Sequence, residues 1–238
     1  MTLLIDSGNS RVKFGRWRAG EVVDTGSCNQ GDDLARHLDL SHPTDAVACN
    51  VAGPRAAQAI DKVCAASDVQ VRWLTSTHPV PGLLPGYSDP SSLGDDRWFA
   101  MAGGRVGRVG PVCVVDCGTA TTLDLIDREG QHRGGLILPG IATMRDALHR
   151  RAHGLTVPID ESQSFALSTD AAIAAGTLTA LVGGIDRALN SARKMLGDEL
   201  VYVVTGGESA LIAPALEHPV EVDASLVLRG LAFAAELK

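Results

Sequence analysis

The sequence predicts an α/β protein of two lobes with duplicated halves. Two segments share one order of features: an apolar strand, an aspartate, a glycine turn and a strand that doubles back. They are LLIDSGNSRVKFG, residues 3–15, and VCVVDCGTATTLDLID, residues 112–127. Strands and helices alternate along the rest of the chain, as in α/β proteins. We therefore expect an N-terminal lobe over residues 1–110, a C-terminal lobe over residues 111–238, and one cleft between them.

Several elements are expected in the first half. Residues 45–51, DAVACNV, and 69–74, VQVRWL, have the apolar, β-branched composition of strands. Residues 54–66 are expected to form a helix, because Pro54 is suited to a first helical position. The segment 76–90 is rich in proline and glycine and is expected to be an irregular loop, followed by a helix within residues 91–106.

The second half continues the alternation. Residues 131–155 predict a strand, a Pro-Gly break and a helix. The alanine-rich segment 168–195 predicts a long helix, and residues 200–212 predict a strand, a glycine turn and a helix. Residues 224–237 are expected to close the chain as a helix.

Composition limits the partners and the compartment. The chain has 238 residues, 45% of them hydrophobic, so it can bury a substantial core. A net charge of -7 argues against a basic nucleic-acid surface. Five cysteines at irregular spacings and the lack of a secretory leader favour a reduced cytoplasm. No apolar stretch is expected to reach the ~20 residues of a membrane span.

The glycine turns point to phosphate chemistry. Turns at 6–10, 116–122 and 205–207 each follow an apolar strand, and exposed backbone N–H groups in such turns can bind phosphate oxygens. Asp6 and Asp116 at the strand ends could hold a cation, and Lys13 could supply a positive charge. This set indicates a nucleotide triphosphate. The P-loop and dinucleotide-binding motifs are absent from the sequence.

Four motifs resemble those of the type III pantothenate kinases, a family in the superfamily of actin and the sugar and acetate kinases. DSGNSRVK at 6–13 matches D-x-G-N-[ST]-x-x-K, and GDDR at 94–97 matches G-x-D-R. DCGTATT at 116–122 matches D-x-G-T-A-x-T, and GGLILPG at 134–140 matches G-G-x-I-x-P-G. The motifs occur in the order found in that family.

The resemblance implies transfer of a phosphoryl group from ATP to pantothenate, the first step of coenzyme A synthesis, with Mg2+ and a monovalent cation, K+ or NH4+. It implies that Asp96 is the general base and that Asp116 binds the monovalent cation; Asp6 is a second candidate metal ligand. Residues implied to contact ATP are Asp6, Ser7, Gly8, Asn9, Ser10, Arg11, Val12, Lys13 and Thr119, with Gly206 and Gly207 near the adenosine. Residues implied to contact pantothenate are Tyr87, Gly94, Asp95, Asp96, Arg97 and Thr169.

Two other functions remain open on the residues alone. A kinase of the same fold could act on a sugar or a small acid, because a fold does not specify a substrate. An accessory protein could bind nucleotide without turnover, although Asp96, Lys13 and Asp116 together favour an enzyme. The small and apolar residues of segment 169–189 leave more apolar surface than one core-facing stripe needs, and with the resemblance they predict a homodimer.

Overall fold

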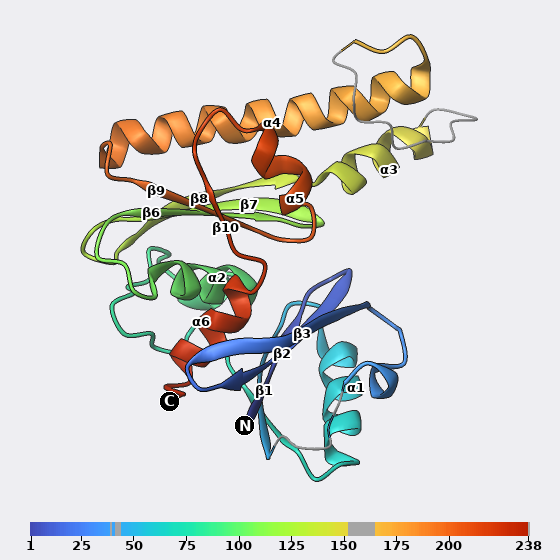
Figure 1. Cartoon of the computed structure of the whole chain (residues 1–238), viewed down its shortest axis with the longest axis vertical. Helices are drawn as coiled ribbons and strands as arrows, with labels where there is room; N and C mark the ends of the chain where they lie inside the picture. The colour runs from blue at the N-terminus through green and yellow to red at the C-terminus, as the bar shows by residue number, and fades with distance from the viewer. Residues whose placement is uncertain (39, 41–43, 152–164, 238) are drawn as a thin grey trace. The chain divides into compact units, whose positions relative to one another are not determined.

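The computed structural model describes residues 1–38, 40, 44–151 and 165–237, and these form two compact units (Figure 1). Unit 1 comprises Met1–Val109, Ile126–Gly134 and Ser225–Lys238, and unit 2 comprises Gly110–Leu125 and Gly135–Ala224. The division differs from the expected 1–110 and 111–238, because the chain returns to unit 1 twice. The second return is made by α6 (Leu226–Ala234), which packs against α2 (Asp95–Arg105).

Unit 1 is built on a five-stranded sheet of order β3-β2-β1-β4-β5. Its strands are β1 (Thr2–Ser7), β2 (Arg11–Arg18), β3 (Glu21–Asn29), β4 (Asp45–Asn50) and β5 (Gln70–Trp73). The β1 strand is antiparallel to β2 and parallel to β4, so the expected hairpin is present. The sequence analysis missed β3. It follows β2 through Ala19 and Gly20, both at positive φ, which matches the twist of a tight hairpin.

Helices cover both faces of this sheet (Figure 1). Successive side chains of a strand point to opposite faces. Leu3 and Ile5 pack in one hydrophobic cluster with Ile60 of α1 (Pro54–Ala65). Leu4 pairs with Gly15 on the opposite face, where Leu228 of α6 lies close to Gly15. The sheet therefore holds Asp6 at the end of a fully buried central strand.

Unit 2 repeats the strand order of unit 1. Its sheet has the order β10-β9-β6-β7-β8. The strands are β6 (Val112–Cys117), β7 (Ala120–Ile126), β8 (His132–Pro139), β9 (Val201–Thr205) and β10 (Glu221–Val222). In each sheet the first strand is central, with the second and third strands on one side and the fourth and fifth on the other. The predicted duplication is confirmed by this topology.

A long helix covers the unit 2 sheet. Helix α4 (Thr169–Leu196) begins where the Ser168 side chain accepts a hydrogen bond from the Ala171 amide and ends before Gly197 at φ +88°. Leu181, Ile185 and Leu189 on one face pack into the core against β6 and β9. Helix α3 spans Ile141–Arg151, and the predicted helical residues 152–155 lie outside the described part of the chain.

By length and composition α4 could also cross a membrane, contrary to the expectation from the sequence. Of its most apolar 18-residue window, 39% is buried within the protein. A core helix passes the same test, so this property alone assigns no membrane span.

Candidate functional site

The first glycine turn joins β1 to β2 and holds the aspartate of the first motif. Asp6 is 5% exposed and lies directly opposite Lys13 in the antiparallel pair. Because paired residues of neighbouring strands point to the same face, the carboxylate and the ammonium group share that face. The Gly8 amide donates to the Arg11 carbonyl at 3.0 Å and closes the turn.

The charges of three carboxylates of unit 1 act on one buried cysteine. Cys49 of β4 is the parallel partner of Asp6, and its Sγ donates to Asp6 Oδ1 at 3.6 Å. Burial raises the pKa of the Cys49 thiol well above its usual value, and the charges of Asp6, Asp96 and Asp95 raise it further. Cys49 therefore bonds to the aspartate of the first glycine turn and lies within electrostatic range of the two GDDR carboxylates.

The GDDR motif forms the start of α2. Asp95 Oδ1 accepts a hydrogen bond from the Ser76 amide at 2.6 Å. Burial raises the pKa of Asp95, and the charge of Asp96 adds to this shift, whereas the hydrogen bonds from Ser76 lower the pKa. Asp96 Oδ1 accepts the Arg97 amide at 2.8 Å. Both carboxylates are half-buried in the first turn of α2.

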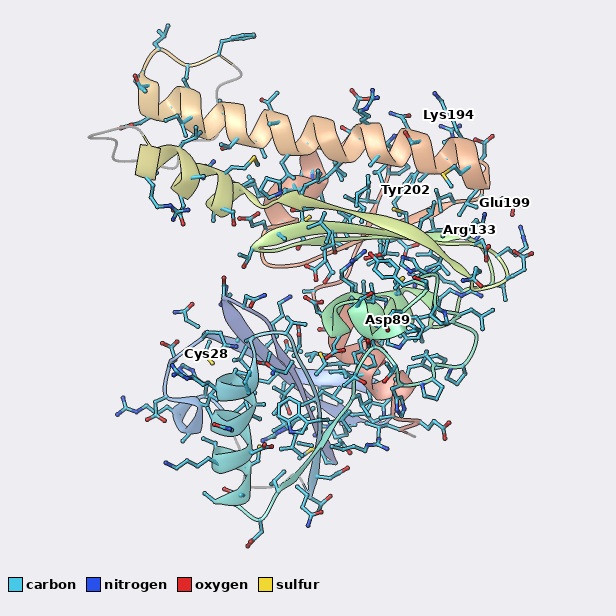
Figure 2. The ribbon with its side chains drawn as sticks, turned by 180° about the vertical axis from the view of Figure 1, so that it is seen from behind. Cys28, Asp89, Arg133, Lys194, Glu199 and Tyr202 are labelled. Carbon is cyan, nitrogen blue, oxygen red and sulfur yellow. The ribbon has the colours of Figure 1, made fainter. Side chains whose placement is uncertain are left out.

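The loop before α2 is shaped by its own hydrogen bonds. Asp89, labelled in Figure 2, accepts the Ser91 amide at 3.0 Å and the Ser91 hydroxyl at 2.7 Å, and these bonds begin the short helix η2 (Pro90–Ser92). The Ser76 hydroxyl donates to the Pro90 carbonyl at 2.9 Å. Residues 76–89 form no helix or strand, as expected from the sequence, and these hydrogen bonds hold the loop next to Asp95.

Arg97, Tyr87 and His132 form a stacked polar cluster in unit 1. Arg97 is 7% exposed, its Nη1 donates to Tyr87 Oη at 3.1 Å, and its guanidinium lies 5.7 Å from the tyrosine ring centre. The Tyr87 ring stacks on His132 with 5.6 Å between centres. A buried guanidinium next to a phenol can bind a carboxylate or amide group of a small substrate.

In unit 2, the second and third glycine turns pack against each other. Gly206 follows β9 at φ +97°, and a Cβ there would lie 2.3 Å from the Cys117 carbonyl and 2.5 Å from Asp116 Oδ1. Burial raises the pKa of the Cys117 thiol to about 12, with Asp116 and Glu208 adding to the shift. Only glycine fits at position 206, and Asp116 lies directly beside this turn.

The GGLILPG motif, residues 134–140, packs against the second glycine turn. The Gly140 amide donates to the Thr119 carbonyl at 3.1 Å, and a Cβ on Gly140 would overlap the Gly118 carbonyl. The Glu208 carboxylate accepts the amides of Ile141 and Ala142 at 3.3 and 3.4 Å, at the start of α3. The conformation of the 118–119 turn is thus fixed by residues far away in the sequence.

Some predicted site residues have structural roles or belong to the other unit. The Val12 side chain is 1% exposed in the unit 1 core, so only its backbone could contact a ligand. Arg11 donates to Ser27 Oγ at 2.6 Å. Thr169 is exposed at the first position of α4 in unit 2, whereas Tyr87 and Arg97 belong to unit 1. A place for Thr169 beside them stays a prediction, as does the nucleotide cleft between the lobes.

The sequence analysis missed four residues of the site. Gln30 Nε2 donates to Ser7 Oγ at 3.0 Å and to the Gly8 carbonyl at 2.7 Å, which holds the first turn from β3. Cys49, His132 and Glu208 contact motif residues that are distant in sequence, as described above. Only Glu208 had a local signal, an acidic residue one position after a glycine turn that ends a strand.

The comparisons with known proteins agree with this geometry. The family model of type III pantothenate kinases matches residues 2–191. The type III pantothenate kinase of Nitrosococcus oceani is 35% identical, covering 99% of this chain and 94% of that protein. The one of Paracidovorax citrulli is also 35% identical, with 98% of each covered.

Solved structures agree in fold. A conserved protein of Campylobacter jejuni assigned to the Baf family of transcriptional activators has a TM-score of 0.62 at 23% identity, with 98% of this chain and 97% of that chain covered. Ethanolamine utilization protein EutJ of Carboxydothermus hydrogenoformans has a TM-score of 0.56 at 15% identity, covering 98% of this chain and 88% of that one. Two α/β units of equal strand order make the duplicated actin-like, sugar-kinase-like fold. By sequence over almost its whole length, the chain belongs to the type III pantothenate kinase family.

Proposed function

We propose that this protein phosphorylates the primary hydroxyl of pantothenate with ATP, the first step of coenzyme A biosynthesis. Membership of the family supports the reaction. The observation that carries it to particular residues is the group around Cys49, whose thiol bonds to Asp6 at the phosphate turn and whose pKa is raised by the charges of Asp6, Asp96 and Asp95 of unit 1.

Asp96 is the proposed general base. Phosphoryl transfer passes through a loose transition state, so catalysis depends mainly on alignment and on neutralising the charge of the transferred group. Asp96, at the start of α2, orients the attacking hydroxyl and accepts its proton. Arg97 and Tyr87, which are hydrogen-bonded to each other, hold the acid substrate beside it.

The glycine turns hold the nucleotide. Backbone amides of the first turn beyond that of Gly8, which donates to Arg11, bind the phosphates together with Lys13. In unit 2 the turn at 118–119 contacts ATP and Gly206-Gly207 lie near the adenosine, where the absence of a side chain on Gly206 lets the two turns pack closely.

The proposed reaction also uses two bound cations. Asp6 would hold Mg2+, directly or through water, at the first turn. Asp116 would hold K+ or NH4+ with the hydroxyl of its strand partner Thr205, which is fully buried and has no hydrogen-bond partner in the described part of the chain. When bound, the cations neutralise phosphate charge.

The protein is further proposed to act in the cytoplasm as a homodimer. All five cysteines are buried and unpaired with one another, as a reduced compartment allows. The outer face of α4 carries Ala172, Gly176, Ala180 and Gly183, all exposed in the chain, which permits close approach of a second helix.

An acceptor panel tests the reaction. Protein, ATP, Mg2+ and K+ are incubated with pantothenate, glucose or acetate, and the product is identified by mass spectrometry while ADP release is recorded. We expect phosphopantothenate alone, and a rate that falls at least about tenfold when K+ is omitted from a sodium- and ammonium-free buffer. Phosphorylated glucose would favour a sugar kinase. ATP binding without any product would favour an accessory nucleotide-binding protein.

A further inference from the structure

A cluster of metal-ligating side chains lies outside the proposed reaction site, at the C-terminal end of β3 and in the segment that follows it. Cys28 Sγ, a carboxylate oxygen of Asp32 and a ring nitrogen of His37 all lie within 4.8 Å of one another. Cys28 is 4% exposed, on the face of the sheet that α1 covers (Figure 2), whereas Asp32 and His37 are exposed. An ion could therefore enter from solvent and meet a buried sulfur.

The local backbone sets these three residues in place. The Asp32 carboxylate accepts the Asn29 amide at 2.8 Å, and Gly31 at φ +92° makes the turn between them. The short helix η1 (Leu34–Arg36) then ends at His37, whose amide donates to the Leu34 carbonyl at 3.0 Å. One thiol, one imidazole and one carboxylate, with a place for water, are a ligand set that Zn2+ uses.

The distances fit an ion after a small adjustment. Ligand atoms at about 2.0–2.3 Å from a tetrahedral zinc lie about 3.3–3.7 Å apart. The present separations, which reach at most 4.8 Å, need to shorten by up to about 1.5 Å, which the exposed Asp32 and His37 side chains can provide by changing rotamer.

We propose that Cys28, Asp32 and His37 bind a Zn2+-like transition-metal ion. The ion would stabilise the conformation of the segment after β3 and, through the hydrogen bonds of Gln30, that of the first phosphate turn. Gln30 lies between two of these ligands in sequence. Its amide donates to the Ser10 carbonyl at 2.9 Å, and its side chain donates to Ser7 and Gly8. An ion that holds residues 28–37 together therefore also holds the three hydrogen bonds that fix the turn.

Metal titration of the whole protein under reducing conditions tests the site. Zn2+ is titrated against a chromophoric chelator, and Co2+ is added in parallel because a cobalt–thiolate bond gives a charge-transfer absorption. We expect one ion per chain and a thiolate band. His37→Ala and Asp32→Asn should weaken binding by more than the ~10–100-fold typical of losing an outer partner. His37 is exposed, so that variant is expected to fold.

Cys28→Ser should abolish the cobalt–thiolate band, and Cys64→Ser is its matched control, a buried cysteine of the same core cluster. Binding of Zn2+ by His37→Ala as tight as by the unaltered protein, or a thiolate band that persists in Cys28→Ser, would overturn the site. The link to the turn is tested by hydrogen exchange of residues 7–13, which Zn2+ should slow in the unaltered protein and not in Gln30→Ala. Equal exchange with and without Zn2+ in the unaltered protein would overturn that link.

Discussion

At the scale of single residues, the proposed chemistry depends on a few carboxylates in different environments. Asp6 is buried at a strand end, while Asp95 and Asp96 are half-buried at a helix start. All three raise the pKa of Cys49 by their charge. Such a concentration of negative charge near a phosphate turn is stable only with a cation or a positive side chain close by, which agrees with the proposed Mg2+ and with Lys13 opposite Asp6.

Asp96→Asn is predicted to lower turnover by about 10²–10⁴-fold, because the amide cannot accept the proton of the attacking hydroxyl. The amide oxygen can still accept the Arg97 amide, so folding and ATP binding should change little. Initial rates with saturating pantothenate, together with ATP binding by calorimetry, measure both effects. Turnover above about a third of the unaltered rate would show that Asp96 is not the general base.

Asp95→Asn is predicted to raise the stability of the fold at neutral pH. Burial raises the pKa of Asp95 above its value of 3.8 in the unfolded chain, so ionisation of this group opposes folding once the pH exceeds that value. The asparagine oxygen keeps the bond from the Ser76 amide.

Urea unfolding midpoints of Asp95→Asn and the unaltered protein, measured from pH 7 downward, check the sign. The advantage of the variant should be largest near pH 7 and should shrink as the pH falls toward 3.8. A variant that is less stable at pH 7 would contradict the account given for this carboxyl group.

At the scale of the elements, the proposed site consists of glycine turns that follow the ends of strands. Each central strand ends in an aspartate followed by a glycine turn, and in unit 2 the turn after β9 packs on the turn after β6. The unit 2 turns leave no room for a Cβ at Gly206 and Gly140, so their geometry depends on glycine at these positions as well as on hydrogen bonds.

Gly206→Ala is predicted to disrupt this packing, because its φ of +97° is strained for alanine and the new Cβ would overlap the Cys117 carbonyl. We expect a loss of ATP affinity of at least about tenfold and a lower melting temperature. Gly207→Ala is the matched control, since a Cβ there meets nothing within 4 Å. Equal effects of the two substitutions would show that the close approach at Gly206 does not matter.

At the scale of the whole molecule, the outer face of α4 is the feature that the single chain leaves unexplained. Gly176 and Gly183 meet nothing within 4 Å at their Cβ positions, although glycine inside a helix costs ~1 kcal/mol relative to alanine. Packing within the described part of the chain gives no reason for glycine at these positions, whereas the proposed contact with a second copy of α4 would give one.

The homodimer is tested by light scattering at micromolar concentration, where we expect twice the 24.8 kDa mass of the chain. Gly183→Arg should give the monomer mass, because a long charged side chain blocks close helix approach. Ser191→Arg, exposed about 80° round the helix from Gly183, is the control and should stay dimeric. A fully active protein of 24.8 kDa would show that the monomer is sufficient.

The sequence by itself determined the features that depend on neighbouring residues. The strand, aspartate and glycine turn of each hairpin follow from local patterns, and the two copies predicted the duplicated sheets that the structure confirms. The start of α2 at the GDDR motif and the length of α4 also follow from local sequence. Helix starts and apolar periodicity depend on residues within a few helical turns of one another.

Only the tertiary structure decided which distant residues meet. Cys49 reaches Asp6 because β4 pairs with β1 in parallel, His132 reaches Tyr87 because the chain returns to unit 1 after β7, and α6 joins unit 1 through its close contact with α2. No local pattern specifies strand register or these returns, since they depend on the burial of surfaces that come together only in the folded chain.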